Sequence, residues 1–78
     1  MGNRSGYNLI LNGHVDVVPI GDPKGWDFDP CGGKITEPTI RGRGTSDMKA
    51  GVACLLFTMR MLKESGAKLG GCLRLHIV

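Results

Sequence analysis

The sequence has little of what small independent domains usually rely on. Its 78 residues include only one Trp, one Tyr and two Phe, so few large side chains can fill a core. The longest apolar stretch, 52–62, is interrupted by Thr58 and Arg60 and is far shorter than the ~20 residues of a membrane span. A folded chain of this length buries only about 60% of the surface that its unfolded form exposes. We therefore expect a small core and no membrane partner.

Cysteine is also scarce. Cys31, Cys54 and Cys72 form no C-x-x-C pair, and their odd number argues against a disulfide framework. No secretory signal pattern precedes them. These features are typical of a reducing environment, so we expect a cytoplasmic protein.

Positive charge is in slight excess but is spread along the chain. Ten Lys and Arg against seven Asp and Glu give a net charge of +3. A nucleic-acid-binding module usually gathers its basic residues into one patch beside stacking aromatic rings. The sequence places no aromatic residue in a basic cluster. We therefore expect no nucleic-acid partner, and a basic nucleic-acid-binding module is the least favoured alternative.

Glycine, in contrast, is abundant: 13 residues separate short patterned segments. Alternating apolar residues predict a strand over 7–18, and Pro19 ends it because proline cannot donate to a sheet. Turn-forming residues then fill a long loop over 19–39. Trp26 and Phe28 would act as apolar anchors for this loop.

A helix and a second strand follow the loop. Apolar residues at helical spacing predict a helix over 48–65, with Thr45 or Ser46 as its N-cap and Gly66 as its C-cap. A second apolar strand is predicted over 72–78. Strand, loop, helix and strand in this order predict an α/β fold with a mainly parallel sheet. Because the sequence stops within a strand, we expect it to be part of a longer protein.

Three residues have the chemistry of a metal site. His14 and Asp16 lie two positions apart on the expected strand, so both side chains point to one face. A carboxylate beside an imidazole is the usual support of a metal-binding histidine. Asp47 stands at the start of the expected helix, where the helix dipole favours a negative charge. Taken singly, each residue is more often incidental, as a surface histidine with a neighbour or an ordinary acid at a helix start.

Gly42-Arg43-Gly44 does not predict a phosphate site. The dinucleotide fingerprint G-x-G-x-x-G would require glycine at position 47, where this sequence has Asp47. A fixed negative charge at a helix start repels an anion and suits a cation.

Two sequence segments, in this order along the chain, resemble the motifs of a known family. GHVDVVP at 13–19 is followed, after a Trp-containing loop, by GRGTSDMK at 42–49. This pattern resembles the zinc-dependent family of acetylornithine deacetylase, succinyl-diaminopimelate desuccinylase, aminoacylase and glutamate carboxypeptidase. The resemblance runs from about Asn8 to the end of the sequence and is closest to the deacetylase and desuccinylase branch. It implies that residues 1–78 are part of a three-layer α/β/α catalytic domain, without the family's lid or dimerisation domain.

The resemblance also implies a role for each site residue. His14 would bind one zinc ion, Asp16 would be the catalytic residue that holds its imidazole, and Asp47 would bridge two zinc ions. The peptide bond after Asp47 would be cis. Co²⁺ or Mn²⁺ would also accept these ligands. The complete enzyme, expected to be a homodimer, would hydrolyse an amide bond in N-acyl amino acids or small peptides.

Several residues that the family uses are missing from this sequence. The family's general base is a glutamate followed by a ligating glutamate, and a further acidic ligand and a last histidine lie far downstream. The only glutamates here, Glu37 and Glu64, stand before a proline and in the last turn of the expected helix. The alternative is therefore a truncated, non-catalytic fragment with at most weak metal binding.

The other polar and sulfur-containing residues are better explained by structural or surface positions than by a catalytic or metal-binding role. His76 alternates with apolar residues and is expected to be structural, within a buried strand. Cys54 is expected to be a small core residue of the helix. Lys49 is expected to be a surface charge, although it could lie near a substrate carboxylate.

Overall fold

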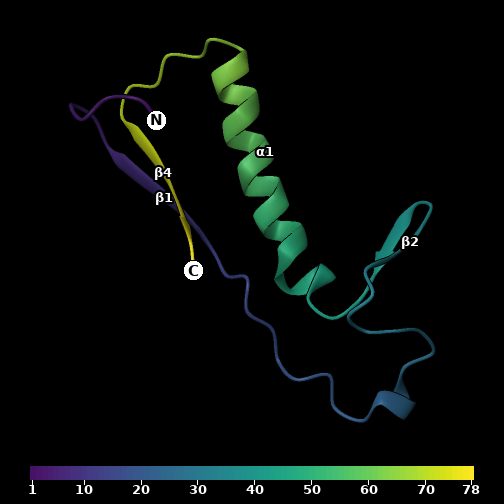
Figure 1. The fold of residues 1–78 in the computed structure, drawn as a ribbon. Helices are drawn as coiled ribbons and strands as arrows, with labels where there is room; N and C mark the ends of the chain where they lie inside the picture. The colour runs from purple at the N-terminus through teal and green to yellow at the C-terminus, as the bar shows by residue number, and fades with distance from the viewer.

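The beginning and the end of the chain meet in a two-stranded parallel sheet (Figure 1). The computed structural model describes residues 1–78 and pairs β1 (Asn8–Gly13) with β4 (Cys72–Ile77). Both strands run opposite to the direction of helix α1 (Ala50–Glu64), which lies beside them. The parallel pairing and the accompanying helix confirm an α/β fold with a parallel sheet.

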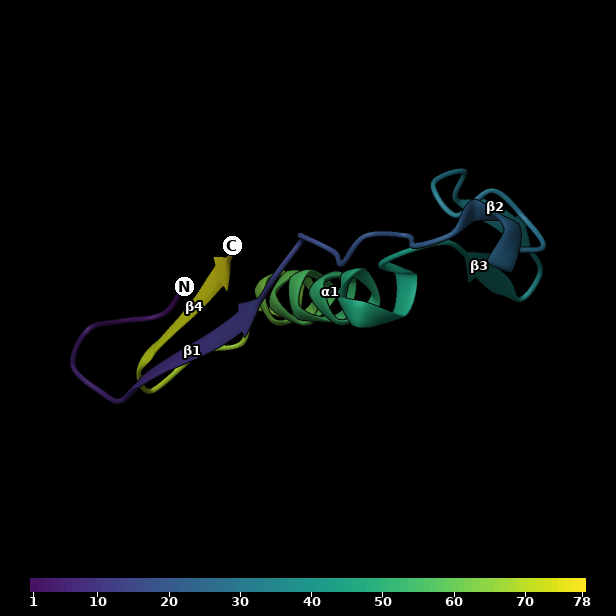
Figure 2. The same ribbon diagram turned by 90° about the horizontal axis from the view of Figure 1, so that it is seen from below.

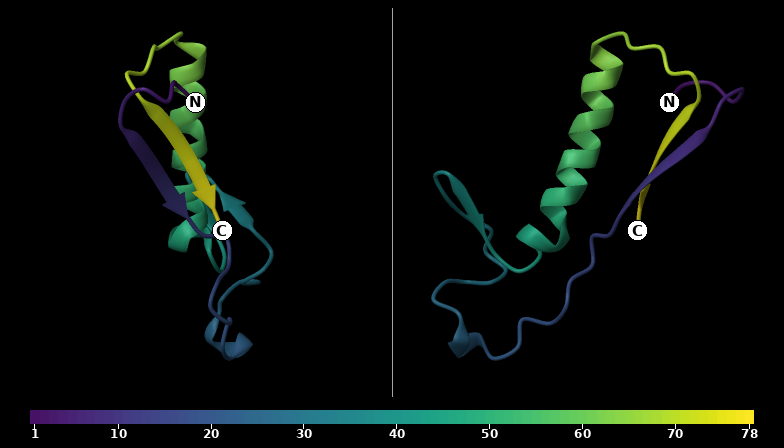
Figure 3. Two further views of the ribbon diagram at one scale, coloured as in Figure 1. Left: turned by 90° about the vertical axis from the view of Figure 1, so that its left-hand side faces the viewer. Right: turned by 180° about the vertical axis from the view of Figure 1, so that it is seen from behind.

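The first strand is shorter than predicted. The expected strand covered 7–18, but β1 ends at Gly13. Beyond the paired strands, two further bonds join the chains: the N–H of Val78 donates to the carbonyl oxygen of Gly13 at 2.9 Å, and the N–H of Val15 donates to that of Val78 at 2.8 Å. The prediction is wrong after Gly13 because β4 ends at Ile77, so the following residues have no neighbouring strand. They continue as an extended chain away from the sheet (Figure 3).

The core between α1 and the sheet is small, as expected from the length. Val52 on α1 and Leu73 on β4 are its two buried apolar residues, 7% and 6% exposed. A Cβ atom on Gly13 would lie only 3.0 Å from Cγ2 of Val52, so the absence of a side chain at Gly13 lets the helix approach the end of β1. No helix of the chain is both long enough and apolar enough to cross a bilayer.

The start of the helix differs from the prediction. An irregular helical turn, η2 (Thr45–Lys49), precedes α1, which begins at Ala50 rather than at residue 48. Neither predicted N-cap is formed: Lys49 occupies that position of α1 without a side-chain cap, and the Thr45 hydroxyl donates to the carbonyl oxygen of Gly42 at 2.9 Å. The backbone dihedral angles of Asp47 are non-helical, so regular helix starts only after it. The peptide bond between Asp47 and Met48 is cis, as the resemblance implied.

The end of the helix is close to the prediction. Ser65 is the C-cap, and Gly66 follows it with φ of 73°, a left-handed conformation that favours glycine. The N–H of Gly66 donates to the carbonyl oxygen of Lys63, and the N–H of Ala67 donates to that of Leu62. This pair of bonds is the Schellman motif, which satisfies the last carbonyl groups of the helix.

The predicted loop over 19–39 contains more structure than expected. After a short helical turn, η1 (Pro23–Gly25), strands β2 (Lys34–Thr36) and β3 (Thr39–Arg41) form an antiparallel hairpin. The β-branched residues on both sides of the Glu37–Pro38 turn favour strand pairing and explain the difference. The hairpin lies beyond the start of α1, far from the parallel sheet (Figure 2).

The two aromatic anchors of this region contact each other. The Trp26 and Phe28 ring centroids are 5.6 Å apart in an edge-to-face arrangement, and Nε1 of Trp26 donates to the carbonyl oxygen of Ile20 at 2.8 Å. The guanidinium of Arg43 lies 4.8 Å from the Trp26 centroid, and that of Arg41 lies 5.5 Å from the Phe28 centroid. No aromatic residue lies in a basic cluster along the sequence, but folding places Arg41 of β3, and Arg43 just after the hairpin, over these two rings.

Two expected core residues are exposed. Cys54 lies on the outer side of α1, and His76 lies on β4 with its side chain open to solvent. Both expectations are wrong within this chain because one helix covers only one face of a two-stranded sheet. Apolar side chains on the uncovered surfaces are exposed as well, including Phe57 at 62% and Val78 at 68%.

Candidate metal centre

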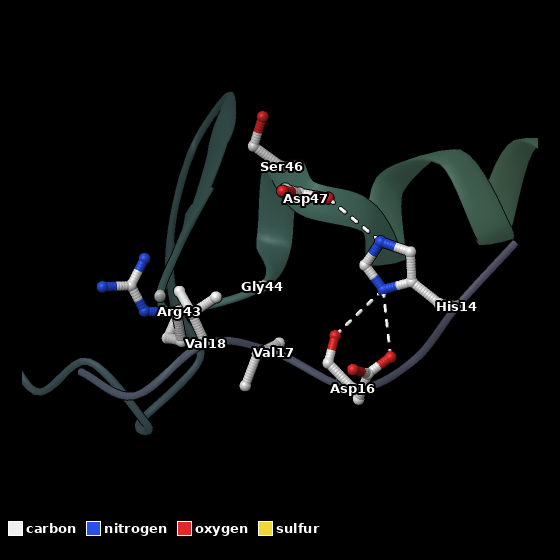
Figure 4. Close-up of a pocket in the computed structure, with 9 residues that line it drawn as sticks. His14, Asp16, Val17, Val18, Arg43, Gly44, Ser46 and Asp47 are labelled. Atoms are coloured by element: carbon white, nitrogen blue, oxygen red, sulfur yellow. Dashed lines mark hydrogen bonds and ion pairs between the residues drawn. The ribbon is translucent and has the colours of Figure 1, made fainter. Parts of the chain in front are cut away.

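The three residues singled out in the sequence meet at one place, just beyond the carboxyl end of β1 (Figure 4). Nε2 of His14 lies 3.2 Å from Oδ1 of Asp47. On the other side of the ring, Nδ1 of His14 lies 3.3 Å from Oδ1 of Asp16 and 3.0 Å from the carbonyl oxygen of Asp16. The imidazole is thus held between two carboxylates that come from different parts of the chain.

Local structure explains why these residues converge. Parallel pairing places the carboxyl ends of β1 and β4 at the same edge of the sheet, where parallel α/β sheets commonly place their functional groups. The helix that packs on Gly13 brings its first turn to the same edge, and Asp47 lies in the η2 turn just before that helix. His14 directly follows Gly13, so the packing of α1 on β1 also sets the distance between the two candidate ligands.

A pocket of about 240 Å³ opens beside the imidazole. It is formed by the extended segment after β1 and by the turn before α1, and its lining residues are His14, Asp16, Val17, Val18, Gly42, Arg43, Gly44, Ser46 and Asp47. Sequence reasoning singled out only the acidic residues and the histidine. The others line the pocket because two distant segments lie side by side, which no local pattern indicates.

Arg43 is the one basic residue of this pocket. Its Nε atom is buried without a hydrogen-bond partner, and its guanidinium stacks on Trp26. Its signal in the sequence, the repeated Arg-Gly of 41–44, does not by itself distinguish a pocket residue from a surface charge. The stacking gives the Arg43 side chain a defined place in the wall of the pocket.

The site is open to water. The side chain of His14 is 39% exposed, and those of Asp16 and Asp47 are 87% and 90% exposed. Exposed ion pairs contribute little to stability because water screens them. The arrangement of these three side chains is therefore better explained by a binding role than by a stabilising one.

The geometry fits a divalent metal ion in part. Two ligands of one tetrahedral zinc, each about 2.1 Å from the metal, lie about 3.4 Å apart, and the His14–Asp47 distance of 3.2 Å is close to this value. The contacts of Nδ1 with Asp16 reproduce the carboxylate support of metal-binding histidines. No group of three or more His, Cys, Asp or Glu side chains is arranged so that it could hold one metal ion, because Asp16 faces the opposite side of the imidazole from Asp47. This chain therefore supplies two candidate metal ligands, His14 and Asp47, and Glu64 is engaged elsewhere, by Nε of Arg60 at 3.0 Å.

Comparison with known proteins points to one family. Residues 10–78 match the model of peptidase family M20/M25/M40. The chain is 55% identical over 51 residues to succinyl-diaminopimelate desuccinylase 2 of Ruegeria sp. (strain TM1040), covering 65% of this chain and 13% of that protein. It is 47% identical over 68 residues to succinyl-diaminopimelate desuccinylase of Methylobacterium nodulans, covering 86% of this chain and 17% of that protein.

A third relative has a different named substrate. The chain is 42% identical over 72 residues to N-formyl-4-amino-5-aminomethyl-2-methylpyrimidine deformylase of Bacillus subtilis (strain 168), covering 92% of this chain and 17% of that protein. The chain thus spans between 13% and 17% of the length of these three relatives. No solved structure matches the chain.

Proposed function

The chain belongs to peptidase family M20/M25/M40, and we propose that the complete protein hydrolyses an amide bond in N-acyl amino acids or small peptides with the help of divalent metal ions. The observation that carries this proposal is the position of His14 between Asp16 and Asp47. The names of the relatives describe removal of a succinyl group or a formyl group, which supports a deacylase-like reaction.

His14 and Asp47 would hold the metal in this chain. Two oxygen atoms of Asp16 face Nδ1 of His14, and with a metal bound they would keep the ring proton on Nδ1 and the lone pair of Nε2 free for the metal ion. Asp47 presents Oδ1 to the same place, and its second carboxylate oxygen is available to a second ion. Two Zn²⁺ ions are the proposed cofactors, and Co²⁺ or Mn²⁺ would accept the same donors. When bound, such ions lower the pKa of a coordinated water molecule and polarise the scissile carbonyl group.

Asp16 is the positioning carboxylate of this pair. It would hold the ring plane of His14 through its contacts with Nδ1. The general base and the remaining ligands are proposed to come from chain beyond these 78 residues, because no third acidic residue or histidine joins the cluster. The substrate would enter the pocket that His14 and Asp47 line.

The rest of the architecture follows from the same proposal. Further strands and helices would cover the exposed apolar surfaces of β1, β4 and α1 and complete a three-layer α/β/α domain. A lid or dimerisation domain, a homodimeric assembly and a cytoplasmic location also belong to the proposal. The three free cysteines support the reducing compartment.

Metal content tests the proposal most directly. In the full-length protein, Asp47→Ala should remove at least one zinc ion and abolish hydrolysis of N-succinyl and N-formyl substrates. Glu64→Ala is the matched control, because this carboxylate lies at the other end of the helix and pairs only with Arg60. Unchanged metal content and activity in the Asp47→Ala protein would contradict the assignment.

The second candidate is a non-catalytic product of 78 residues. It is favoured by the presence of only two metal-binding side chains in the cluster. The intact mass of the native product separates the two candidates: a mass of 8.3 kDa together with no zinc-dependent turnover supports this one. A much larger mass, or robust turnover by the 78-residue chain, contradicts it.

A further inference from the structure

The segment that carries His14 and Asp16 is held at its middle residue, Val15. Because this segment lies beyond β1, it has no strand ladder of its own. The N–H of Val15 donates to the carbonyl oxygen of Val78 at 2.8 Å, and the carbonyl oxygen of Val15 accepts from Nζ of Lys49 at 2.8 Å. One peptide group is thus tied to the end of β4, and the next is tied to the start of α1.

Lys49 is connected to Asp47 as well. It follows Asp47 by two positions, and its N–H donates to the carbonyl oxygen of Gly44 at 2.9 Å, which closes the η2 turn. Its side chain reaches the segment of His14. The same residue therefore contacts both of the segments that supply the candidate metal ligands.

Gly44 provides an independent observation at the same junction. It is buried and has φ of 83°. A Cβ atom on Gly44 would collide with Cγ1 of Val17 and would lie 3.0 Å from Nζ of Lys49. The missing side chain lets the extended segment and the turn approach each other where the Lys49 side chain crosses between them.

Lys49 also lines a second pocket, between the β2–β3 hairpin and the start of α1, but its ammonium group bonds to Val15. It takes part in none of the three ion pairs of the structure. It is also absent from the lining of the pocket that contains His14 and Asp47, so a place beside a substrate carboxylate is not favoured. The Lys49 ammonium donates to a backbone carbonyl group. Hydrogen bonds from charged donors are stronger than those between two neutral groups.

We propose that Lys49 is a positioning residue of the metal centre: its ammonium group, through the carbonyl of Val15, fixes the His14–Asp16 segment against the turn that carries Asp47. This inference rests on the proposed function, because it concerns the same metal-binding side chains. It adds a residue that touches neither the metal nor the substrate, and it explains how two segments joined by a long excursion keep His14 and Asp47 within 3.2 Å.

Cobalt binding by the full-length protein tests the proposal. Lys49→Met keeps the length of the side chain and removes the donor, and Lys63→Met is the matched control, since Lys63 lies in the last turn of α1 and its ammonium has no partner. Lys49→Met should weaken Co²⁺ binding by about 10- to 100-fold, the range seen when the support of a metal ligand is lost, and should change the visible spectrum of bound Co²⁺. Lys49→Arg should restore most of the affinity, and Lys63→Met should match the wild type.

His14→Ala in the same series separates the two proposals. If it abolishes Co²⁺ binding while Lys49→Met behaves like Lys63→Met, the role of Lys49 is wrong and the metal site stands. If His14→Ala and Asp47→Ala leave Co²⁺ binding unchanged, the metal site is wrong and the role of Lys49 falls with it. Circular dichroism checks the fold. Should Lys49→Met unfold, Lys49→Leu removes the donor with a shorter apolar side chain, and wild-type Co²⁺ affinity in the folded Leu variant would overturn the inference.

Discussion

Nε2 of His14 and Oδ1 of Asp47 lie 3.2 Å apart, although a long excursion containing a β-hairpin separates them along the chain. The first residue follows a strand of the parallel sheet, and the second precedes the helix that packs on that strand. Their contact is therefore a consequence of the β1–α1 packing at Gly13.

The support of the imidazole can be tested at Asp16. Asp16→Asn removes the negative charge and offers an amide that can donate to Nδ1, which would move the ring proton to Nε2. We expect metal affinity to fall by about 10- to 100-fold, as for other partners of metal-binding histidines. Isothermal titration with Zn²⁺ measures the change, and Asp27→Asn, a carboxylate with no partner, is the control. Equal affinity of the two variants would contradict the role of Asp16.

Gly44 and Gly21 have similar backbone conformations but different surroundings, so their alanine variants can be compared directly. Gly44 has φ of 83° and Gly21 has φ of 74°, but an added Cβ meets Val17 at the first position and nothing within 4 Å at the second. Gly21→Ala should lower the free energy of unfolding by about 1 kcal/mol, the usual cost of a left-handed alanine. Gly44→Ala should cost more and should also reduce metal binding. Thermal unfolding and metal titration of both variants check this, and equal behaviour would argue against a close approach at Gly44.

The contact between Trp26 and Phe28 is expected to stabilise the long loop that joins β1 to the β2–β3 hairpin. Trp26→Ala removes the contacts with Phe28 and Arg43 and the hydrogen bond to Ile20. We expect a loss of about 1–2 kcal/mol in the free energy of unfolding, from one aromatic pair and one cation–π contact. Limited proteolysis should then cut faster within 20–33. Tyr7→Ala, at a side chain that is 97% exposed, should leave the cleavage rate unchanged.

Removal of metal gives a prediction for the whole protein. Dialysis against a chelator should abolish hydrolysis and lower the thermal midpoint, because the folded protein binds the metal more tightly than the unfolded chain does. Zn²⁺ or Co²⁺ should restore both properties. Mg²⁺ should not, because it prefers an octahedral shell of oxygen ligands to imidazole. Full activity in the chelated protein would argue against metal-assisted hydrolysis.

Much of the site could be predicted from the sequence because its signals are local. His14 and Asp16 lie two positions apart, and Asp47 lies in the segment before a clear apolar stripe. The structure brings these three residues together, and the parallel pairing of β1 with β4 agrees with the order of the elements. Their roles in metal binding stay predictions.

Other features depend on partners that a local pattern does not identify. The end of β1 is set by where β4 ends, and the hairpin by a turn at Glu37–Pro38 within a region rich in turn residues. Whether Cys54 is buried depends on what lies against the outer side of α1. The bond from Lys49 to Val15 joins a side chain to a backbone carbonyl across a large sequence separation, so no spacing rule indicates it.

The small core between α1 and the sheet has a thermodynamic consequence for a metal held by His14 and Asp47. Such an ion would join two points separated by the whole excursion, and so would close a long loop as a cross-link does. In the unfolded chain, bringing the two ligands together costs a loop-closure entropy that grows with the logarithm of loop length, so the unfolded chain would bind the ion weakly. Folding and metal occupancy would then be coupled, with about 1.4 kcal/mol of added stability for each tenfold rise in free metal above its dissociation constant.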